Sequence, residues 1–196
     1  MALARTFQRP WPSLAICLAI ALAGADPLRA ALPSDSAPVP TEYQVKAAFL
    51  FNFPKFVEWP PEKLDGPNTP LVIGFVGDDP FGGALEQITH NKQVQGHPIE
   101  LRRFNAGEDL RSCHVLFVSR SESARLQEIL NAVKNSAVLT VSEMDQFLVQ
   151  GGIINFFIEA DSVKFGINPK AAELSGLKLS AKLLAVARTQ TIPPKR

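Results

Sequence analysis

The side chains best suited to catalysis or metal binding are few and poorly spaced. The chain has three histidines, His90, His97 and His114, and none stands at a metal-ligand spacing from another histidine or from a cysteine. Cys113 and His114 are adjacent, so on a strand their side chains would point to opposite faces. We therefore predict no catalytic Cys–His pair, no metal site and no cofactor.

Two further motifs that could bind or activate a substrate are incomplete. No serine lies in a G-x-S-x-G nucleophile elbow. Gly74 and Gly77 flank a strand-to-helix turn, but the dinucleotide fingerprint needs G-x-G-x-x-G. Asp78 and Asp79 follow at once, and their charges would repel a phosphate. A tight turn before a helix capped by Asp79 explains the segment, and we predict that the protein is not an enzyme.

Basic residues near the C-terminus allow two interpretations. Lys164, Lys170 and Lys178 could form an anion-binding or partner-binding patch, and Lys164, Asn168 and Lys178 could mark a small-ligand site. Alternatively, the lysines of this region form the solvated side of a helix, predicted from Pro169 to about Thr189, whose leucines face the core.

An aromatic segment opens the folded part of the chain. Thr41 and Glu42 are typical of a helix start, and the apolar residues that follow have helical spacing. Pro54 predicts a break near Phe53, because proline removes a helical hydrogen bond. The segment is apolar on more than one side, which favours burial on two faces, in the core or in a subunit contact. The candidate residues for a partner or dimer surface are Phe51, Phe53, Phe56 and Trp59.

The rest of the chain alternates strand and helix patterns. Short apolar runs predict strands at 71–76, 113–119, 137–141, 153–158 and 163–167, and the alternation of Ile99 to Phe104 predicts an edge strand. Predicted helices between and after them cover 80–91, 121–133, 142–148 and the C-terminal segment. This order predicts an α/β three-layer sandwich: a mostly parallel sheet of about six strands, flanking helices, and an antiparallel edge hairpin.

The first 25 residues have the three parts of a signal peptide. Arg5 and Arg9 precede an apolar run from Ser13 to Ala23, and Ala23-Gly24-Ala25 is a small-x-small cleavage site. The apolar run is shorter than the roughly 20 residues that cross a bilayer. We expect export to the periplasm, then a flexible lead-in at 26–41, one domain at 42–190 and a tail at 191–196.

Charge and cysteine use narrow the possible partners. Residues 1–25 contain two arginines and no acid, so their removal changes the formal net charge from +1 to −1. A nearly neutral chain without a basic stripe is not expected to bind nucleic acid. Cys113 would then be the lone mature thiol, either a small residue at a strand entrance or an intermolecular or regulatory thiol.

Several segments resemble the YfiR family. The first runs from Glu42 through Phe53 to the Phe56-Val57-Glu58-Trp59-Pro60 stretch. The others are 72–81, 151–154 with 163–168, and 171–184, so the resemblance covers nearly all of 42–190. Pro54 departs from the pattern, and a lone Cys113 cannot reproduce the paired cysteines associated with the family.

The resemblance implies a periplasmic, dimeric α/β regulator. Such a protein would repress an inner-membrane diguanylate cyclase by binding its periplasmic region, and an outer-membrane lipoprotein would relieve the repression. Cyclic-di-GMP signalling and biofilm formation would respond. The alternative is a periplasmic small-molecule sensor that binds a nucleotide or an amino acid near Lys164, Asn168 and Lys178.

Overall fold

A twisted, mostly parallel sheet forms the centre of the domain in the computed structural model, which describes residues 40–66 and 68–188. Its longer strands are β2 (Leu71–Val76), β4 (His97–Phe104), β5 (Val115–Val118), β6 (Leu139–Ser142), β7 (Ile154–Glu159) and β8 (Ser162–Ile167). With β3 (Gln93–Val94), the order is β3-β4-β2-β5-β6-β7-β8. Strands β4, β2, β5, β6 and β7 run parallel, and β8 returns antiparallel to β7. The predicted α/β fold with an antiparallel edge hairpin is confirmed.

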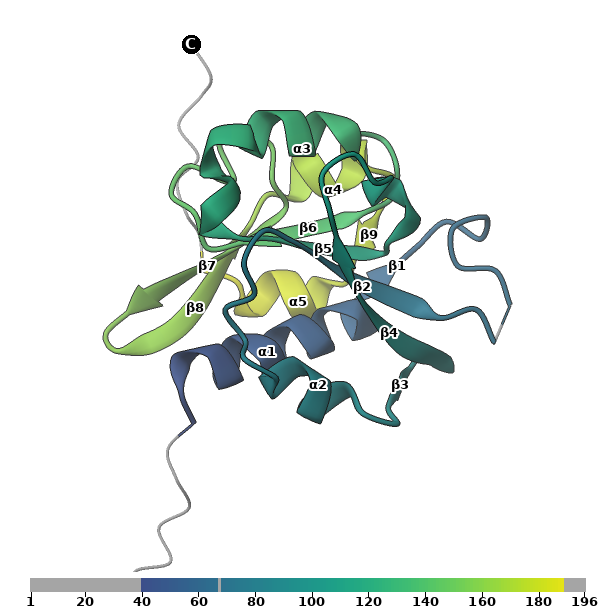
Figure 1. Cartoon of the computed structure of the whole chain (residues 1–196), viewed down its shortest axis with the longest axis horizontal. Helices are drawn as coiled ribbons and strands as arrows, with labels where there is room; N and C mark the ends of the chain where they lie inside the picture. The colour runs from purple at the N-terminus through teal and green to yellow at the C-terminus, as the bar shows by residue number, and fades with distance from the viewer. Residues whose placement is uncertain (1–39, 67, 189–196) are drawn as a thin grey trace, which may run out of the picture. The chain divides into compact units, whose positions relative to one another are not determined.

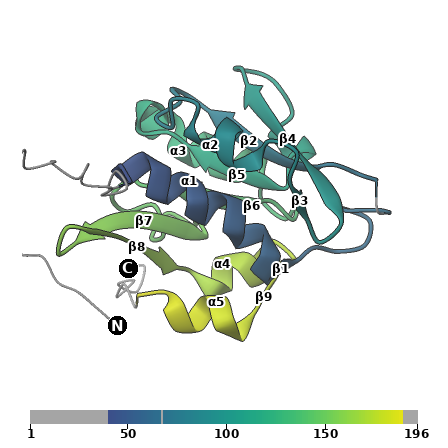
Figure 2. The same ribbon diagram turned by 90° about the horizontal axis from the view of Figure 1, so that it is seen from below.

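Helices cover both faces of this sheet (Figures 1 and 2). On one face lie α1 (Glu42–Asn52), α2 (Ala84–Thr89) and α5 (Ala181–Val186), and on the other lies α3 (Leu126–Ala132). Alternate residues of each strand therefore enter two separate cores. Phe117 and Val141 join the core under α1, whereas Leu116 and Val118 join the core under α3.

Local hydrogen bonds set both ends of α1. The Thr41 hydroxyl accepts a hydrogen bond from the Gln44 N–H, and the Gln44 side chain accepts one from the Thr41 N–H, a reciprocal capping box. The helix ends at Asn52, and a 3₁₀ turn, η1 (Phe53–Phe56), follows with Pro54 near its start. The predicted break near Phe53 is confirmed. The chain then enters the short strand β1 (Val57–Glu58).

The prediction of a single C-terminal helix beginning at Pro169 is wrong. The segment instead forms α4 (Pro169–Leu174), the short strand β9 (Lys178–Leu179) and α5. Gly176 has φ +79°, a left-handed conformation that ends α4. Leu177 is then buried, and β9 pairs antiparallel with β1. Ser180 caps α5 through a bond from the Leu183 N–H to its hydroxyl.

Three other boundaries differ from the prediction. Helix α2 begins at Ala84, not at Pro80, because Gly82 and Gly83 both have positive φ; Asp79 instead accepts a hydrogen bond from the Phe81 N–H. The helix predicted to start near Ser121 begins as a 3₁₀ turn, η3 (Arg120–Arg125). The segment after Ser142 forms turns instead of a helix, although the Ser142 hydroxyl does accept the Met144 N–H.

Candidate interaction and ligand-binding sites

The position where open α/β sheets usually bind ligands is filled in this protein. From β2 the chain moves outward to β4, and from β5 it moves outward in the other direction, so the switch point lies at the carboxyl ends of β2 and β5. Gly77 follows β2 with φ +85°, and a Cβ there would lie 2.4 Å from the Ser121 hydroxyl oxygen. That hydroxyl accepts a hydrogen bond from the Asp78 N–H at 3.0 Å. The protein's own η3 segment therefore occupies the crevice.

A buried ion pair lies at the end of the neighbouring strand. Glu143 follows β6 and Lys46 projects from α1, and their side chains are 4% and 2% exposed. The Lys46 ammonium donates to Glu143 Oε2 and also to the Glu42 carboxylate. Glu143 Oε1 accepts from the Tyr43 hydroxyl and from Arg120 Nε, both at 3.1 Å. We call these five residues the α1–β6 network.

The network keeps both buried groups ionised. Burial alone would raise the pKa of Glu143, but the hydrogen bond and charge of Lys46, with the charge of Arg120, outweigh it and the pKa is lowered. Burial would lower the pKa of Lys46, but its bonds to Glu143 and Glu42 raise it. With two cations and two carboxylates the network has no formal excess charge. It therefore holds α1 against the sheet and offers no net attraction to a charged ligand.

The sequence predicts that Phe53 lies on a partner or dimer surface, but the structure buries it in the core. It is 1% exposed and its ring lies 5.0 Å from Phe165 and 5.7 Å from Phe156, centroid to centroid. Its α1-side neighbour Phe49 stacks on it. Phe53 is therefore a core residue: its backbone continues the helical geometry of α1, so it lies one turn after Phe49 on the same face, against β7 and β8.

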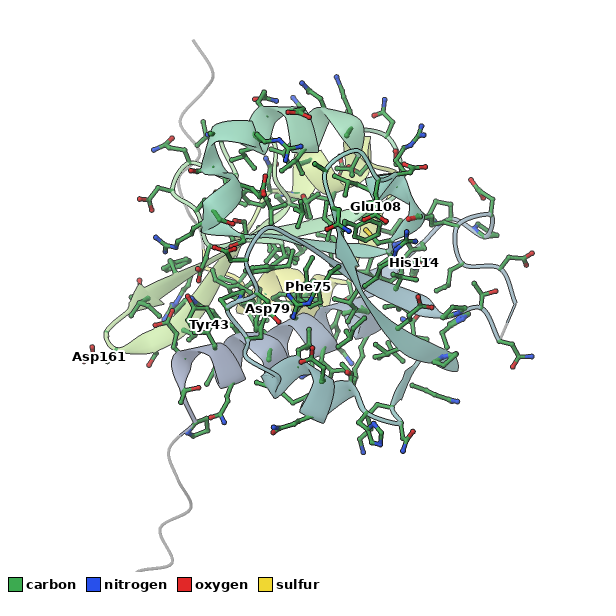
Figure 3. The ribbon with its side chains drawn as sticks, viewed as in Figure 1. Tyr43, Phe75, Asp79, Glu108, His114 and Asp161 are labelled. Carbon is green, nitrogen blue, oxygen red and sulfur yellow. The ribbon has the colours of Figure 1, made fainter. Side chains whose placement is uncertain are left out.

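The other three aromatic residues of that prediction stay partly exposed. The Lys55 ammonium lies over the Phe51 ring, 4.4 Å from its centroid. Phe56 lies on η1, and Trp59 comes directly after β1. Helix α5 contacts η1 and adds Leu184, which is 38% exposed. We call Phe51, Phe56, Trp59 and Leu184 the aromatic surface. It lies toward the amino ends of the parallel strands, whereas the α1–β6 network lies at their carboxyl ends; Figure 3 shows Tyr43 and His114 at these opposite ends.

His114 is a buried, neutral histidine that fixes the loop beneath the aromatic surface. Its Nδ1 accepts from the Val72 N–H at 3.0 Å, so Nε2 must carry the proton and donate to the Lys63 carbonyl at 2.9 Å. The Trp59 ring packs edge-on against it, with centroids 6.1 Å apart. Burial lowers the pKa of His114, although its bond to Lys63 opposes the shift. These contacts explain the burial of His114 without any catalytic role.

His114 should make stability depend on pH in a defined direction. Because its pKa is lower in the folded state than the ordinary value near 6.5, the unfolded chain binds more protons below that pH. The free energy of unfolding should fall as the pH drops from 7.5 to 5.5, by up to about 1.4 kcal/mol per pH unit from this group. His114→Gln, which keeps one acceptor and one donor, should show a shallower slope in urea titrations at each pH. Equal slopes would contradict the assignment.

Cys113 is inaccessible in the folded domain. Its side chain is 0% exposed, and its thiol donates to the Leu110 carbonyl at 3.1 Å. Burial raises the pKa of this thiol to about 12. Since the thiolate is the reactive form, the structure favours the packing interpretation of Cys113 over the regulatory one.

The three residues of the predicted ligand patch do not share one site. Lys164 lies on β8, and Lys178 lies on β9 directly across from Glu58 of β1, an opposite-charge cross-strand pair. Asn168 caps α4: its Oδ1 accepts from the Ala171 N–H, and its Nδ2 donates to the Leu148 carbonyl. Of these three, only Asn168 lines a cleft, of about 410 Å³, between α3 and α4, and Lys170 of the predicted basic patch lines the same cleft.

Two elements of these sites have no local sequence signal. Lys46 and Glu143 are 97 residues apart, and Lys46 reads as the partner of Glu42 four residues earlier on an exposed helix face. The α3–α4 cleft depends on where α4 ends, and the helix predicted to reach Thr189 runs about 15 residues past Leu174. An isolated glycine such as Gly176 is tolerated within a helical pattern, so it did not mark that end.

The part of the chain that the structure describes contains no group of three or more His, Cys, Asp or Glu side chains placed to hold a metal ion. Within the same residues, no helix has both the length and the apolar character needed to cross a membrane. The predicted signal peptide and tail lie outside the described residues.

The fold and these sites define an α/β sandwich whose exposed features are an aromatic surface and a small cleft. A family model for YfiR/HmsC-like proteins matches residues 43–188. The chain therefore belongs to the YfiR/HmsC-like family, which confirms the resemblance seen in the sequence. Proteins of this family are periplasmic and regulatory rather than catalytic. No curated protein sequence matches the chain.

Proposed function

We propose that this protein represses an inner-membrane diguanylate cyclase by binding the cyclase's periplasmic region. The observation that carries the proposal is family membership, because the YfiR/HmsC-like match spans the folded domain from α1 to the end of α5. Family proteins are linked to cyclic-di-GMP signalling, and export by residues 1–25 would place this one beside the periplasmic part of such an enzyme.

The aromatic surface is the proposed contact with the cyclase. Protein interfaces are enriched in aromatic residues at their centre and are polar at their rim. Truncating a central aromatic residue often removes most of the affinity. Phe51 is half-buried, so it is held in place by α1 while part of its ring remains accessible. Phe56 on η1 is likewise half-buried, and Leu184 is 38% exposed on α5, which contacts η1.

Complementation of a deletion strain tests the proposal. Deleting the gene should raise cellular cyclic-di-GMP, measured by mass spectrometry, and increase biofilm. Wild-type protein should restore the low level, whereas the double variant F51A/F56A should not, although it accumulates in the periplasm. Ile158→Ala is the matched control, because Ile158 is an apolar side chain, 49% exposed, on the β7–β8 hairpin. An unchanged cyclic-di-GMP level across several growth conditions would contradict repression.

Two further parts of this proposal concern assembly. We propose that the protein is a homodimer and that an outer-membrane lipoprotein sequesters it to release the cyclase; both rest on the family. Crosslinking of the tagged mature protein in the envelope, followed by mass spectrometry, should capture a membrane protein with a cyclase output domain. Light scattering after gel filtration should give twice the mass of the mature chain.

A further inference from the structure

The cleft between α3 and α4 has the shape and the polar lining of a small-molecule site. Its walls come from the end of α3 and the turn after it, from α4, and from the loop that precedes β7. Its volume of about 410 Å³ lies within the range of ordinary ligand pockets. None of the residues that line it belongs to the aromatic surface, so the two sites are separate.

The charge on the cleft has one sign. Lys134 and Lys170 line it from opposite sides, one after α3 and the other on α4, and no carboxylate is among the lining residues. Neither lysine forms an ion pair with any of residues 40–66 or 68–188. Two uncompensated ammonium groups facing one concave volume favour an anionic ligand.

The floor supplies a buried donor. Thr140 of β6 lines the cleft and is 3% exposed. Its Oγ1 already accepts the Ile153 N–H at 3.0 Å, so the hydroxyl proton remains available to an acceptor in the cleft. Asn168 cannot serve in this way, because both ends of its amide bond to the backbone; it holds the start of α4 against the loop at Leu148.

The remaining wall is apolar. Leu130 and Val133 reach the cleft from the core under α3, and Leu174 stands on α4 with 63% of its side chain exposed. An exposed leucine beside two lysines suits a ligand that has an apolar body and a charged end. The lining therefore favours a ligand with an anionic group and an apolar part.

We propose that the α3–α4 cleft binds a small organic anion. Its carboxylate or phosphate lies between Lys134 and Lys170, near the Thr140 hydroxyl, and its apolar part lies against Leu130 and Leu174. The site uses none of the aromatic surface, so the proposal does not rest on repression of a cyclase.

Titrations of the ¹⁵N-labelled mature protein test the site. Phenylacetate and phenyl phosphate carry the two anionic groups on the same ring, and benzyl alcohol is the neutral control. We expect one or both anions to shift backbone amides of 127–135 and 168–175, with little effect from benzyl alcohol. Response to phenylacetate alone assigns a carboxylate ligand, response to phenyl phosphate alone assigns a phosphate ligand, and response to both assigns charge as the main determinant.

Variants separate this site from nonspecific binding. The double variant K134A/K170A should weaken binding of the active anion at least about tenfold, as the loss of two charge-assisted contacts requires. Both lysines are exposed, so the fold should survive. Lys178→Ala is the matched control, since Lys178 is an exposed lysine outside the cleft and should leave the affinity unchanged. Absence of shifts with both anions, shifts elsewhere, or equal affinity in the double variant would each overturn the proposal.

Discussion

Substituting Lys46 with Met should lower the free energy of unfolding by about 3–5 kcal/mol, the usual effect of removing one partner from a buried ion pair. The change leaves Glu143 buried with Tyr43 and the largely exposed Arg120 as its remaining donors. Urea denaturation followed by circular dichroism measures the loss. Lys55→Met is the control, because Lys55 is exposed: its ammonium bonds to Asn52 and lies over the Phe51 ring in solvent, and the change should alter stability by less than about 0.5 kcal/mol.

The double variant K46M/E143L tests the physical reason. If the cost comes from stranding one charge, removing both should cost less than the two single substitutions together. Lowering the pH should also reduce the difference between wild type and K46M. The pKa of Glu143 is lowered in the folded state, so its stabilisation is present above the ordinary carboxyl pKa and is lost as the pH falls below it. Additive costs, or a difference unaffected by acid, would contradict a buried charge pair.

Phe53→Ala should be similarly destabilising, by about 3–5 kcal/mol, because it opens a cavity among packed aromatic rings. Phe53 contacts Phe49, Phe156 and Phe165 and thereby joins η1 to the β7–β8 hairpin. Urea denaturation of the mature protein measures the effect. Phe51→Ala, two residues away on a half-buried position, should cost less than about 1.5 kcal/mol. Equal costs for the two variants would contradict the division between core and aromatic surface.

That division shows where sequence reasoning reached its limit. Apolar runs such as Leu71–Val76 identify buried strands because β2 is covered on both faces, whereas β4 was predicted from the alternation of Ile99 to Phe104. Within the aromatic segment, helical spacing places Phe53 on the face of Phe49 and Phe51 on another side. Spacing alone does not show which of these faces packs against the sheet; the contacts of Phe53 with Phe156 and Phe165 do.

The site residues that escaped prediction depend on long-range contacts. Glu143 reads as a helix-start carboxylate, and its buried partners come from α1 and η3, which only the sheet order brings together. Lys164, Asn168, Lys170 and Lys178 are close in sequence and were predicted to meet near the C-terminal strands and helix. The left-handed Gly176 turns Lys178 away to β9, and the cleft keeps Asn168 and Lys170 together with Lys134, which was not predicted.

The two borders of the main sheet restrict how copies of this protein can associate. On one border, β3 pairs with only two residues of β4. The rest of β4 carries exposed charged side chains, those of Glu100, Arg102 and Arg103. On the other, the backbone of Arg188 pairs with β8 at Gly166, and its N–H donates to the Phe165 carbonyl. Charged side chains and a covering segment discourage the addition of a foreign strand. If two copies of this chain associate, they are therefore expected to meet through side chains of their helices and not by joining the edges of their sheets.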